Sequence, residues 1–357
     1  MRDLMFGLMG CGRITKKHVA AIHDVEGATL ASVCDVVGDR ARQWGDRAGV
    51  PHYRDLDEML GNQPEIDVVC ILTPSGNHAD HCVQVASHGK HVVVEKPMAL
   101  RLQDADRMIM ACDNAGVRLF VVKQNRYNIP IQRLRRALEE GRFGKLVLGT
   151  ARVRWCRPQA YYDQDAWRGT WALDGGVLAN QASHHIDLLE WMMGDVATVF
   201  AKTATQLVDV ETEDTAVVVL TFVNGALGII EATTATRPTD LEGSISVLGE
   251  RGTVVVGGFA ANEMKAWQFV DERPEDASVV GDTRTMPEDV YGFGHKAFLN
   301  NVVTCIREDG AALVDGLEGR RSLELINAIY ESVEIGQEVS LRFRPTHCRL
   351  GEPRPKK

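Results

Sequence analysis

Short apolar runs alternate with amphipathic stretches over the first third of the chain. Unbroken apolar runs predict buried strands, and apolar residues that recur every three or four positions predict helices. The expected strands span residues 4–10, 28–34, 66–72, 91–94 and 118–122. The expected helices span residues 14–23, 38–48, 79–87 and 101–115. Fully apolar strands that are separated by helices predict a doubly wound parallel sheet, which we assign to an α/β domain over residues 1–122.

The remainder of the chain has a different pattern, in which strands follow one another without helices between them. A helix is expected over residues 130–140, a strand over 146–156 and a helix over 177–193. Strand-like runs then cover residues 196–207, 214–222, 226–235, 243–248 and 252–257, and two helices cover 295–308 and 318–335. This order predicts an open-faced, mostly antiparallel sheet with helices on one side, in an α+β domain over residues 123–345. Residues 346–357 are expected to form a loose tail.

Composition and charge narrow the range of partners. The formal net charge is −9 and the sequence pI is about 5.7, which disfavours nucleic-acid binding because that function needs a basic surface. No run approaches the roughly 20 apolar residues of a membrane span, and the first residues lead into a strand without a signal peptide. The eight cysteines include no C-x-x-C pair and predict reduced core thiols. We therefore expect a cytoplasmic protein that binds neither nucleic acid nor membrane.

A glycine-rich turn follows the first expected strand. Gly10 and Gly12 permit a tight turn and the close approach of a pyrophosphate to the start of the first helix, although Thr15 replaces the third glycine of this pattern. Asp35 ends the second expected strand, where a carboxylate accepts hydrogen bonds from a ribose and repels the 2′-phosphate of NADP. The alternative is an ordinary tight turn. The combination of strand, turn, helix and acidic residue predicts a Rossmann-type site for NAD.

A lysine at the end of a strand is the central candidate for chemistry. Residues 91–97 read His-Val-Val-Val-Glu-Lys-Pro, so an apolar strand leads to Lys96 and the following proline ends it. Ligands bind at the carboxyl ends of strands in an open parallel sheet, so Lys96 is expected beside the nicotinamide. Residues 73–78 leave the preceding strand at the same edge, and they form either a loop against the cofactor or a plain turn.

A histidine in the second half is the candidate partner of Lys96. Asn180 and His184 are four residues apart and would share one helix face, with Asp187 three residues further on to orient the ring. A metal site is disfavoured, because His184 and His185 project about 100° apart on a helix and the sequence has no H-E-x-x-H motif. We therefore expect no bound metal.

These motifs follow one another in a recognisable order. The glycine turn with Asp35, the loop 73–78, the Glu95-Lys96-Pro97 motif and the helix with His184 resemble the Gfo/Idh/MocA family of oxidoreductases over essentially the whole chain. The resemblance implies NAD(P)-dependent oxidation of a sugar or polyol, a Rossmann domain followed by an open-faced sheet domain, and homo-oligomers (tetramers or dimers) packed through that sheet. In the family an aspartate commonly stands where this chain has Asn180.

Within the family, a closer resemblance is to the bacterial UDP-N-acetylglucosaminuronate 3-dehydrogenases of the WlbA/WbpB type. The segments that carry it are residues 120–126, 167–171, 180–184, 241–245 and 290–295. It implies oxidation of the 3-hydroxyl of a nucleotide-activated sugar acid, on a route to surface polysaccharide, with Lys96 and His184 flanking that hydroxyl. The expected cofactor residues are Gly10, Gly12, Arg13, Ile14, Asp35, Thr73, Pro74, Ser75, His78, Glu95, Lys96 and Gln124. The expected substrate residues are Lys96, Asn125, Arg126, Arg157, Tyr161, Trp167, Arg168, Asn180, His184 and His295.

One segment supports an anionic substrate independently of the resemblance. Residues 150–171 contain Arg152, Arg154, Arg157 and Arg168 together with three tryptophans and two tyrosines, in a chain that is acidic overall. Arginine suits carboxylate or pyrophosphate, and aromatic faces suit a sugar or a uracil. The alternative is that the arginines cover an exposed strand face and the tryptophans fill the core.

Two other functions are compatible with the same motifs. One is an inositol or free-sugar dehydrogenase, which needs no nucleotide on its substrate. The other is an NAD-binding regulator without catalytic activity, although the presence of both Lys96 and His184 counts against it. Either residue can serve as the base that takes the hydroxyl proton, since a buried lysine loses affinity for its proton and histidine titrates near neutrality.

Overall fold

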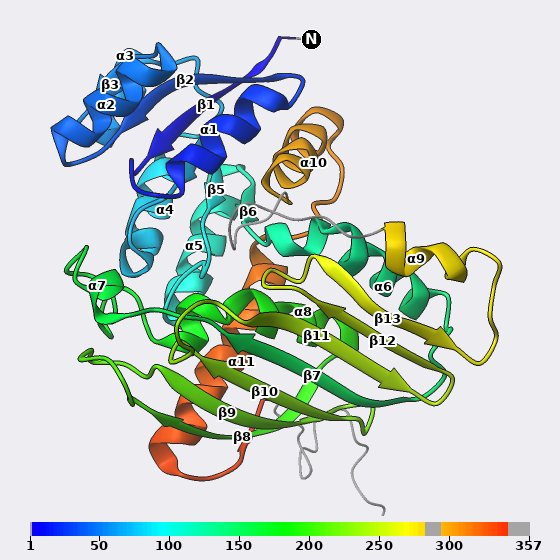
Figure 1. Ribbon diagram of the computed structural model, residues 1–357. Helices are drawn as coiled ribbons and strands as arrows, with labels where there is room; N and C mark the ends of the chain where they lie inside the picture. The colour runs from blue at the N-terminus through cyan, green and yellow to red at the C-terminus, as the bar shows by residue number, and fades with distance from the viewer. Residues whose placement is uncertain (1, 283–293, 342–357) are drawn as a thin grey trace, which may run out of the picture.

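The first domain is built on a six-stranded sheet in which every strand runs parallel to its neighbours (Figure 1). In spatial order the strands are β3 (His52–Tyr53), β2 (Ala28–Cys34), β1 (Leu4–Met9), β4 (Val68–Ile71), β5 (His91–Val94) and β6 (Leu119–Val121). The structure, a computed structural model, describes residues 2–282 and 294–341. The strand order reverses between β1 and β4, and ligands bind beyond the strand ends at such a point. The predicted doubly wound domain is confirmed.

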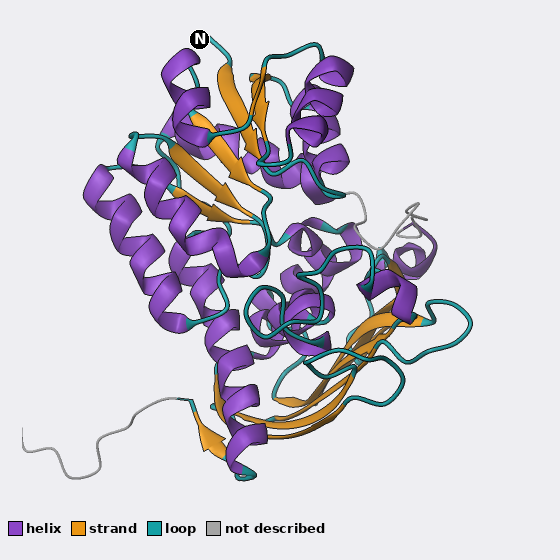
Figure 2. Ribbon diagram, turned by 90° about the vertical axis from the view of Figure 1, so that its left-hand side faces the viewer, coloured by secondary structure: helices purple, strands orange, loops and turns teal. Residues whose placement is uncertain are grey.

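Helices cover this sheet on both faces (Figure 2). They include α1 (Thr15–Asp24), α2 (Gly38–Ala48), α3 (Leu56–Asn62), α4 (His78–Ser87) and α5 (Leu102–Ala115). The central strand β4 is buried at every position, as expected of a strand that helices cover on both sides. The apolar pattern predicted these elements to within two residues, except β3 and α3, which are too short to show a period.

A helix from late in the chain also belongs to the first domain. Helix α10 (Gly294–Glu308) lies beside α1 (Figure 1), and its Phe298, Leu299 and Val302 share one buried cluster with Phe6 and Leu8 of β1. The simple division into residues 1–122 and 123–345 therefore does not describe the packing, because the chain crosses back to cover the first sheet. This return was not predictable from the apolar pattern, since an amphipathic helix does not reveal which sheet its apolar face meets.

The second domain is built on an eight-stranded sheet in the order β13-β12-β11-β7-β10-β9-β8-β14. Its strands are β7 (Leu146–Arg154), β8 (Val196–Ala204), β9 (Thr215–Phe222), β10 (Leu227–Thr233), β11 (Glu242–Gly249), β12 (Gly252–Gly257), β13 (Glu263–Phe269) and β14 (Val339–Ser340). All neighbouring pairs are antiparallel except β10 with β7. The predicted mostly antiparallel sheet is confirmed, and β13 and β14 are additions to it.

The helices of the second domain lie on one side of its sheet, the side that faces the first domain (Figures 1 and 2). They include α6 (Ile129–Glu139), α8 (Ser183–Met193) and α11 (Gly316–Ile335), and the shorter helices α7 (Gln159–Tyr162) and α9 (Asp276–Asp282) lie at its margins. Apolar residues of α6, α8 and α11 form one buried cluster with the inward residues of β7 to β12. This cluster fixes α8, and with it His184, against the sheet.

The opposite face of this sheet carries exposed apolar side chains. Residues on β8, β9 and β10 alternate between buried and exposed, and the exposed set includes Phe200, Val217, Val219, Leu227 and Ile229. Phe200 pairs with Val219 and Val219 pairs with Ile229 across the strands, so the three form one row. We call these five residues the open-face patch. A contiguous apolar patch of this kind is typical of a surface that another molecule covers.

Some predictions fall outside the described residues: the tail 346–357, the domain end at 345 and residues 290–293 of the family segment. Within the described ranges, no helix combines the length and the apolar character needed to cross a bilayer.

Candidate active site

The segments predicted to carry the chemistry meet at one edge of the first sheet. Strand β1 pairs with β4 and β4 with β5, so their carboxyl ends lie side by side. The glycine turn leaves β1, the loop 73–78 leaves β4 and the Glu95-Lys96-Pro97 motif leaves β5 at this edge. Three predictions made from separate parts of the sequence thus converge on one place.

The glycine turn has the shape and the space for a pyrophosphate. Gly10 has a φ of +101°, and a Cβ there would lie 2.8 Å from the carbonyl of Leu72, so only glycine fits. At Gly12 no described atom lies within 4 Å of the position of a Cβ, which leaves room for a ligand. No side chain among the described residues caps the start of α1, so its first N–H groups are available to an anion. These features fit NAD.

Two polar side chains complete the turn. Thr15, at the place of the third glycine, is fully buried and its hydroxyl donates to the carbonyl of Gly10 at 3.1 Å, so it stabilises the turn from within. Asp35 accepts hydrogen bonds from the N–H groups of Cys11 at 2.7 Å and Val37 at 2.8 Å. A carboxylate has about four acceptor positions, so Asp35 retains capacity for a ribose hydroxyl while it braces the turn.

His78 lies between two backbone segments. It was expected to line the cofactor, and its ring is buried, with Nδ1 2.9 Å from the Pro97 carbonyl and Nε2 2.8 Å from the Thr73 carbonyl. Both ring nitrogens therefore lie within hydrogen-bond distance of backbone carbonyls, and a contact between His78 and the cofactor stays a prediction. His78 links the loop after β4 to the segment after β5, and so supports the backbone that carries Lys96.

Lys96 reaches from the first domain to the second. Its ammonium donates to the backbone carbonyl of Asn180 at 2.8 Å and lies 3.4 Å from that residue's side-chain oxygen. Burial lowers the pKa of Lys96 to about 8, with two carboxylates acting against this change and two cations reinforcing it. Those carboxylates are Glu95 and Asp174, and the cations are Lys123 and Arg168. A substantial fraction of Lys96 is therefore neutral at mildly alkaline pH, and neutral lysine accepts a proton.

The segment that presents Asn180 is not the regular helix predicted from the sequence. Val177–Gln181 forms a π-helical turn, and α8 begins only at Ser183. The carboxylate of Glu213 accepts a hydrogen bond from Leu178 N–H at 2.9 Å and so holds the widened turn. The prediction that Asn180 and His184 share a face of one regular helix is wrong. Both still reach the same site, and turns of this type often occur at functional sites.

His184 is buried on α8, beside the same site. Its Nε2 lies 3.0 Å from the side-chain nitrogen of Gln124, which donates to Nε2 in the tautomer that carries its proton on Nδ1. Nδ1 has no hydrogen-bond partner within the described part of the chain. Burial, followed by the charges of Lys96 and Lys123, holds the pKa of His184 well below its ordinary value. The ring is therefore neutral and offers an N–H donor.

Asp187 does not orient the ring of His184, as the helix spacing predicted. Its carboxylate accepts two hydrogen bonds from Arg126, each of 2.8 Å, and lies 3.6 Å from the Lys123 ammonium. Burial opposes ionisation, but Arg126 and Lys123 lower the pKa of Asp187 to about 2. Arg126 also donates to Glu318 at 2.9 Å and is buried, so its donors serve this ionic cluster, and its contact with a substrate stays a prediction.

The aromatic segment predicted to bind anions gathers around Tyr161. The guanidinium carbons of Arg168, Arg157 and Arg13 lie 4.6, 5.4 and 5.5 Å from the centre of its ring. The Tyr161 hydroxyl accepts hydrogen bonds from Arg168 at 2.7 Å and from Gln181 at 3.1 Å. We call Arg13, Arg157, Tyr161 and Arg168 the arginine cluster. Guanidinium groups in this number suit a phosphate or a carboxylate.

The arginine cluster lies next to Lys96 through a short chain of contacts. The side-chain nitrogen of Gln181, which donates to Tyr161, also lies 3.4 Å from the side-chain oxygen of Asn180. Trp167, another predicted substrate residue, stacks with the Arg168 guanidinium at 4.6 Å. Asn125, by contrast, is buried, and its contact with a substrate stays a prediction.

The other basic residues of the segment lie elsewhere. Arg154 pairs with Glu231 at 2.6 Å, and Arg152 lies 3.8 Å from the same carboxylate, both beside the open-face patch. Trp155 is buried in the core of the second domain. For these residues the alternative interpretation is correct: the two arginines lie on the outer face of the strand, and the tryptophan fills the core.

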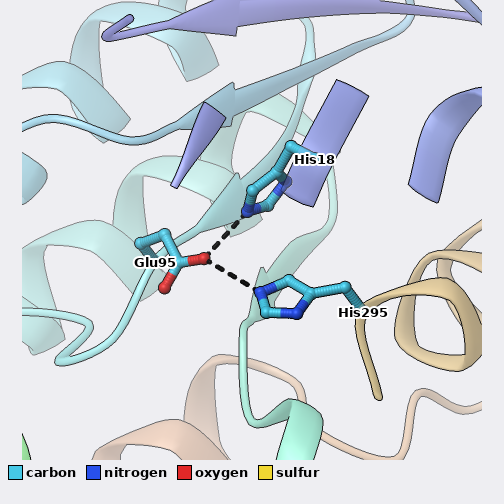
Figure 3. A group of neighbouring side chains, drawn as sticks. All are labelled: His18, Glu95 and His295. Carbon is cyan, nitrogen blue, oxygen red and sulfur yellow. Dashed lines mark hydrogen bonds and ion pairs between the residues drawn. The ribbon is translucent and has the colours of Figure 1, made fainter. Parts of the chain in front are cut away.

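Glu95 forms a buried cluster with two histidines (Figure 3). Its Oε1 lies 2.8 Å from Nε2 of His18 on α1 and 3.6 Å from Nε2 of His295 on α10. Burial opposes the charge, but the two histidines hold the pKa of Glu95 well below its ordinary value. His295 was predicted to contact substrate, whereas its ring lies against Glu95 in this cluster. The cluster ties both helices to the motif that carries Lys96.

These three side chains also have the chemistry of a metal site, since their ligand atoms all lie within 4.8 Å of one another. The 2.8 Å contact between His18 and Glu95 is a normal hydrogen bond, so a proton already satisfies that pair. That the chain binds no metal stays a prediction.

Two groups at the site were not predicted from the sequence. Asp174 accepts hydrogen bonds from the side-chain amide of Asn180 and, at 2.8 Å, from Gly169 N–H. His18 supports Glu95 from α1. An aspartate before a pair of glycines reads as an ordinary turn, and His18 fits the buried face of a helix. Neither pattern reveals a partner that is distant in the sequence.

Comparison with known proteins identifies the family. The family model for the NAD-binding Rossmann fold of the Gfo/Idh/MocA oxidoreductases matches residues 4–123, and the model for the C-terminal alpha/beta domain of the same family matches residues 135–341. These matches cover most of the chain, and they confirm the resemblance drawn from the motifs.

Two solved structures are similar along their full length. One is the WlbA dehydrogenase of Bordetella pertussis in complex with NADH and UDP-GlcNAcA, with 45% identity, a TM-score of 0.91, and coverage of 96% of this chain and 99% of that one. The other is the WlbA dehydrogenase of Chromobacterium violaceum in complex with the same two ligands, with 42% identity, a TM-score of 0.89, and coverage of 97% and 98%.

Relatives by sequence act on simpler compounds. The myo-inositol 2-dehydrogenase of Thermotoga maritima is 29% identical over 349 residues, which are 95% of this chain and 98% of that protein. The D-apiose dehydrogenase of Paraburkholderia graminis is 27% identical over 358 residues, 94% of this chain and 89% of that protein. The fold, the NAD-binding domain and these relatives agree: the chain belongs to the Gfo/Idh/MocA oxidoreductase family and is an NAD-dependent sugar dehydrogenase.

Proposed function

We propose that the enzyme oxidises the 3-hydroxyl of a nucleotide-activated sugar acid of the UDP-N-acetylglucosaminuronate kind. The observation that carries this proposal is the arginine cluster beside Lys96. A substrate with a diphosphate and a carboxylate needs several bidentate donors, whereas a free polyol needs none. The 45% identical WlbA dehydrogenase, crystallised with NADH and UDP-GlcNAcA, supports the same class of substrate.

The cofactor is assigned to the edge formed by the strand ends. The glycine turn and the start of α1 hold the pyrophosphate, and Asp35 accepts the ribose hydroxyls and selects NAD. Other residues assigned to this site are Arg13, Ile14, Thr73, Pro74, Ser75, Glu95 and Gln124. When bound, NAD supplies the ring that accepts a hydride from the sugar carbon.

Lys96 is assigned as the base that takes the hydroxyl proton. Its partly neutral amine is held by the Asn180 carbonyl and can accept the proton as the hydride leaves. His184 is assigned the complementary task, because its acceptor nitrogen is occupied by Gln124 and its protonated nitrogen can only donate. It therefore positions the sugar oxygen with a hydrogen bond and leaves proton transfer to Lys96.

A second candidate substrate is an unactivated polyol, which the myo-inositol and D-apiose dehydrogenases among the relatives favour. The arginine cluster separates the two candidates, since an uncharged substrate offers its guanidinium groups no anion to bind. The similarity to WlbA also supports a place in the synthesis of surface-polysaccharide sugars. A cytoplasmic location accords with the seven cysteines of the described ranges, all of which are free thiols.

A substrate comparison tests the proposed function. Purified enzyme with NAD is given UDP-N-acetylglucosaminuronate, myo-inositol or glucose, with and without 2-oxoglutarate to reoxidise any NADH that stays bound. Turnover with the nucleotide sugar acid should exceed turnover with the others by about 100-fold or more in kcat/KM, because the smaller compounds have no anionic groups to bind the arginine cluster. Arg168→Gln should raise KM for the nucleotide sugar, whereas the matched control Arg152→Gln on the open sheet face should not. Equal or better turnover of myo-inositol would establish the second candidate instead.

The pH dependence tests the assignment of the base. A base must be deprotonated to act, so kcat/KM should rise tenfold per pH unit at low pH and level off above about pH 8, the pKa of Lys96. Lys96→Ala should lose about 10²- to 10⁴-fold in kcat and should lose this limb of the profile. Cofactor binding, measured by NADH fluorescence, checks that the variant retains its first domain. If the rise of kcat/KM with pH is unchanged in the variant, a group other than Lys96 takes the proton.

We further propose that the enzyme forms a homo-oligomer, a dimer or tetramer, through the open-face patch. Phe200, Val219 and Ile229 form an exposed apolar row, flanked by Val217 and Leu227. Burying such a row against a second copy removes apolar surface from water, at roughly 25 cal/mol per Å². The charged residues beside it, such as Arg152 and Glu231, would form the rim.

Charge substitution in the patch tests this interface. Val219→Glu combined with Ile229→Glu places like charges on neighbouring strands and should convert the oligomer to a species of lower mass, as measured by light scattering after gel filtration. Leu317→Glu is the control, because Leu317 is also an exposed apolar residue but lies on α11, away from the open face. Unchanged mass in the double variant would show that the chain associates elsewhere or not at all.

A further inference from the structure

Asp174 occupies a buried position beside Asn180, and no motif assigns it a task. It lies in the loop between α7 and the π-helical turn, with only 2% of its surface exposed. One carboxylate oxygen accepts from Gly169 N–H at 2.8 Å, and the other accepts from the side-chain amide of Asn180. Both oxygens are thus fixed, one by the backbone and one by a residue that contacts Lys96.

The side chain of Asn180 connects this carboxylate to Lys96. An amide donates only through its nitrogen and accepts only through its oxygen. Because Asp174 engages the nitrogen, the oxygen must face the other way, toward the Lys96 ammonium at 3.4 Å. The Lys96 ammonium and the Gln181 side-chain nitrogen, which both donate toward the amide oxygen, favour the same orientation. Asp174 fixes this direction of the Asn180 dipole from the opposite side, by accepting from the amide nitrogen.

Charge balance around Lys96 gives Asp174 a second effect. The charged and titratable groups that influence Lys96 are Glu95, Asp174, Lys123, Arg168 and His184, of which Asp174 and Arg168 come from the same loop. Two are carboxylates, two are cations, and the histidine is neutral. Without Asp174 the cations would outnumber the carboxylates, and the ammonium form of Lys96 would lose part of its stabilisation.

We propose that Asp174 is a positioning residue for Lys96. It orients the side-chain amide of Asn180, and through that amide it supplies the carboxylate that the family commonly has at position 180 itself. The inference rests on the proposed role of Lys96 as the base. The loop 163–174 thus has two tasks: it contributes Arg168 to the arginine cluster, and it positions Lys96 through Asp174. Asp174 is assigned no contact with the reacting carbon or with the cofactor.

A charge-exchange experiment tests this inference. Asp174→Asn should move the rising limb of kcat/KM to lower pH by about one unit, since the ammonium form loses a stabilising charge, and should lower kcat because the amide is no longer oriented. The double variant Asp174→Asn with Asn180→Asp places the carboxylate directly at Lys96, and the limb should return to the wild-type pH or above it. Asp163→Asn, an exposed aspartate of the same loop, is the matched control and should change neither quantity.

A second readout does not depend on any substrate. The rate of trace acetylation of Lys96, measured by mass spectrometry across pH in the absence of sugar and cofactor, should show the same displacement of its midpoint in Asp174→Asn. The inference is overturned if Asp174→Asn changes neither the pH midpoint of Lys96 acetylation nor the pH at which kcat/KM rises. If the wild-type enzyme turned over no nucleotide sugar while the acetylation midpoint still shifted, the proposed function would fail and the link between Asp174 and Lys96 would stand.

Discussion

The hydrogen bond from the Lys96 ammonium to the Asn180 carbonyl is the contact on which the site depends. It joins the end of β5 in the first domain to the π-helical turn in the second, at 2.8 Å. The end of the strand holds the backbone of Lys96 in position, and the Asn180 carbonyl gives its buried ammonium a fixed hydrogen-bond partner. Burial makes a hydrogen-bond partner necessary for the ammonium, and burial also lowers the pKa of Lys96 to about 8. The position of the amine and its basicity therefore have the same cause.

Buried charges around this contact are each matched by partners from other elements. Glu95 is held by His18 and His295. The carboxylate of Asp187 is held by two hydrogen bonds from Arg126. Removing one partner of a buried pair typically costs about 3–5 kcal/mol, because the remaining charge is left without compensation. The site is thus rigid before any ligand binds, as expected of a site that must align a hydroxyl with a nicotinamide.

Local patterns in the sequence predicted the parts of the molecule that depend on local physics. Unbroken apolar runs located the buried strands, the glycines before α1 located the turn, and the proline after Lys96 located a strand end. The sequence did not predict the return of α10 to the first sheet or the partners of Asp187 and His295, because these depend on contacts between distant segments. It also missed the π-helical turn, since the side chain that widens it, Glu213, comes 35 residues after Leu178.

Chemical rescue tests most directly whether Lys96 takes the proton. If Lys96 is the base, methylamine restores turnover to Lys96→Ala in proportion to the concentration of its unprotonated form, because the free amine occupies the space of the lost side chain beside Asn180. His184→Ala should gain nothing from imidazole beyond a change in KM, since its ring only positions the sugar oxygen. Failure of methylamine in a Lys96→Ala enzyme that binds NADH normally, together with restoration of kcat to His184→Ala by imidazole, would contradict the account.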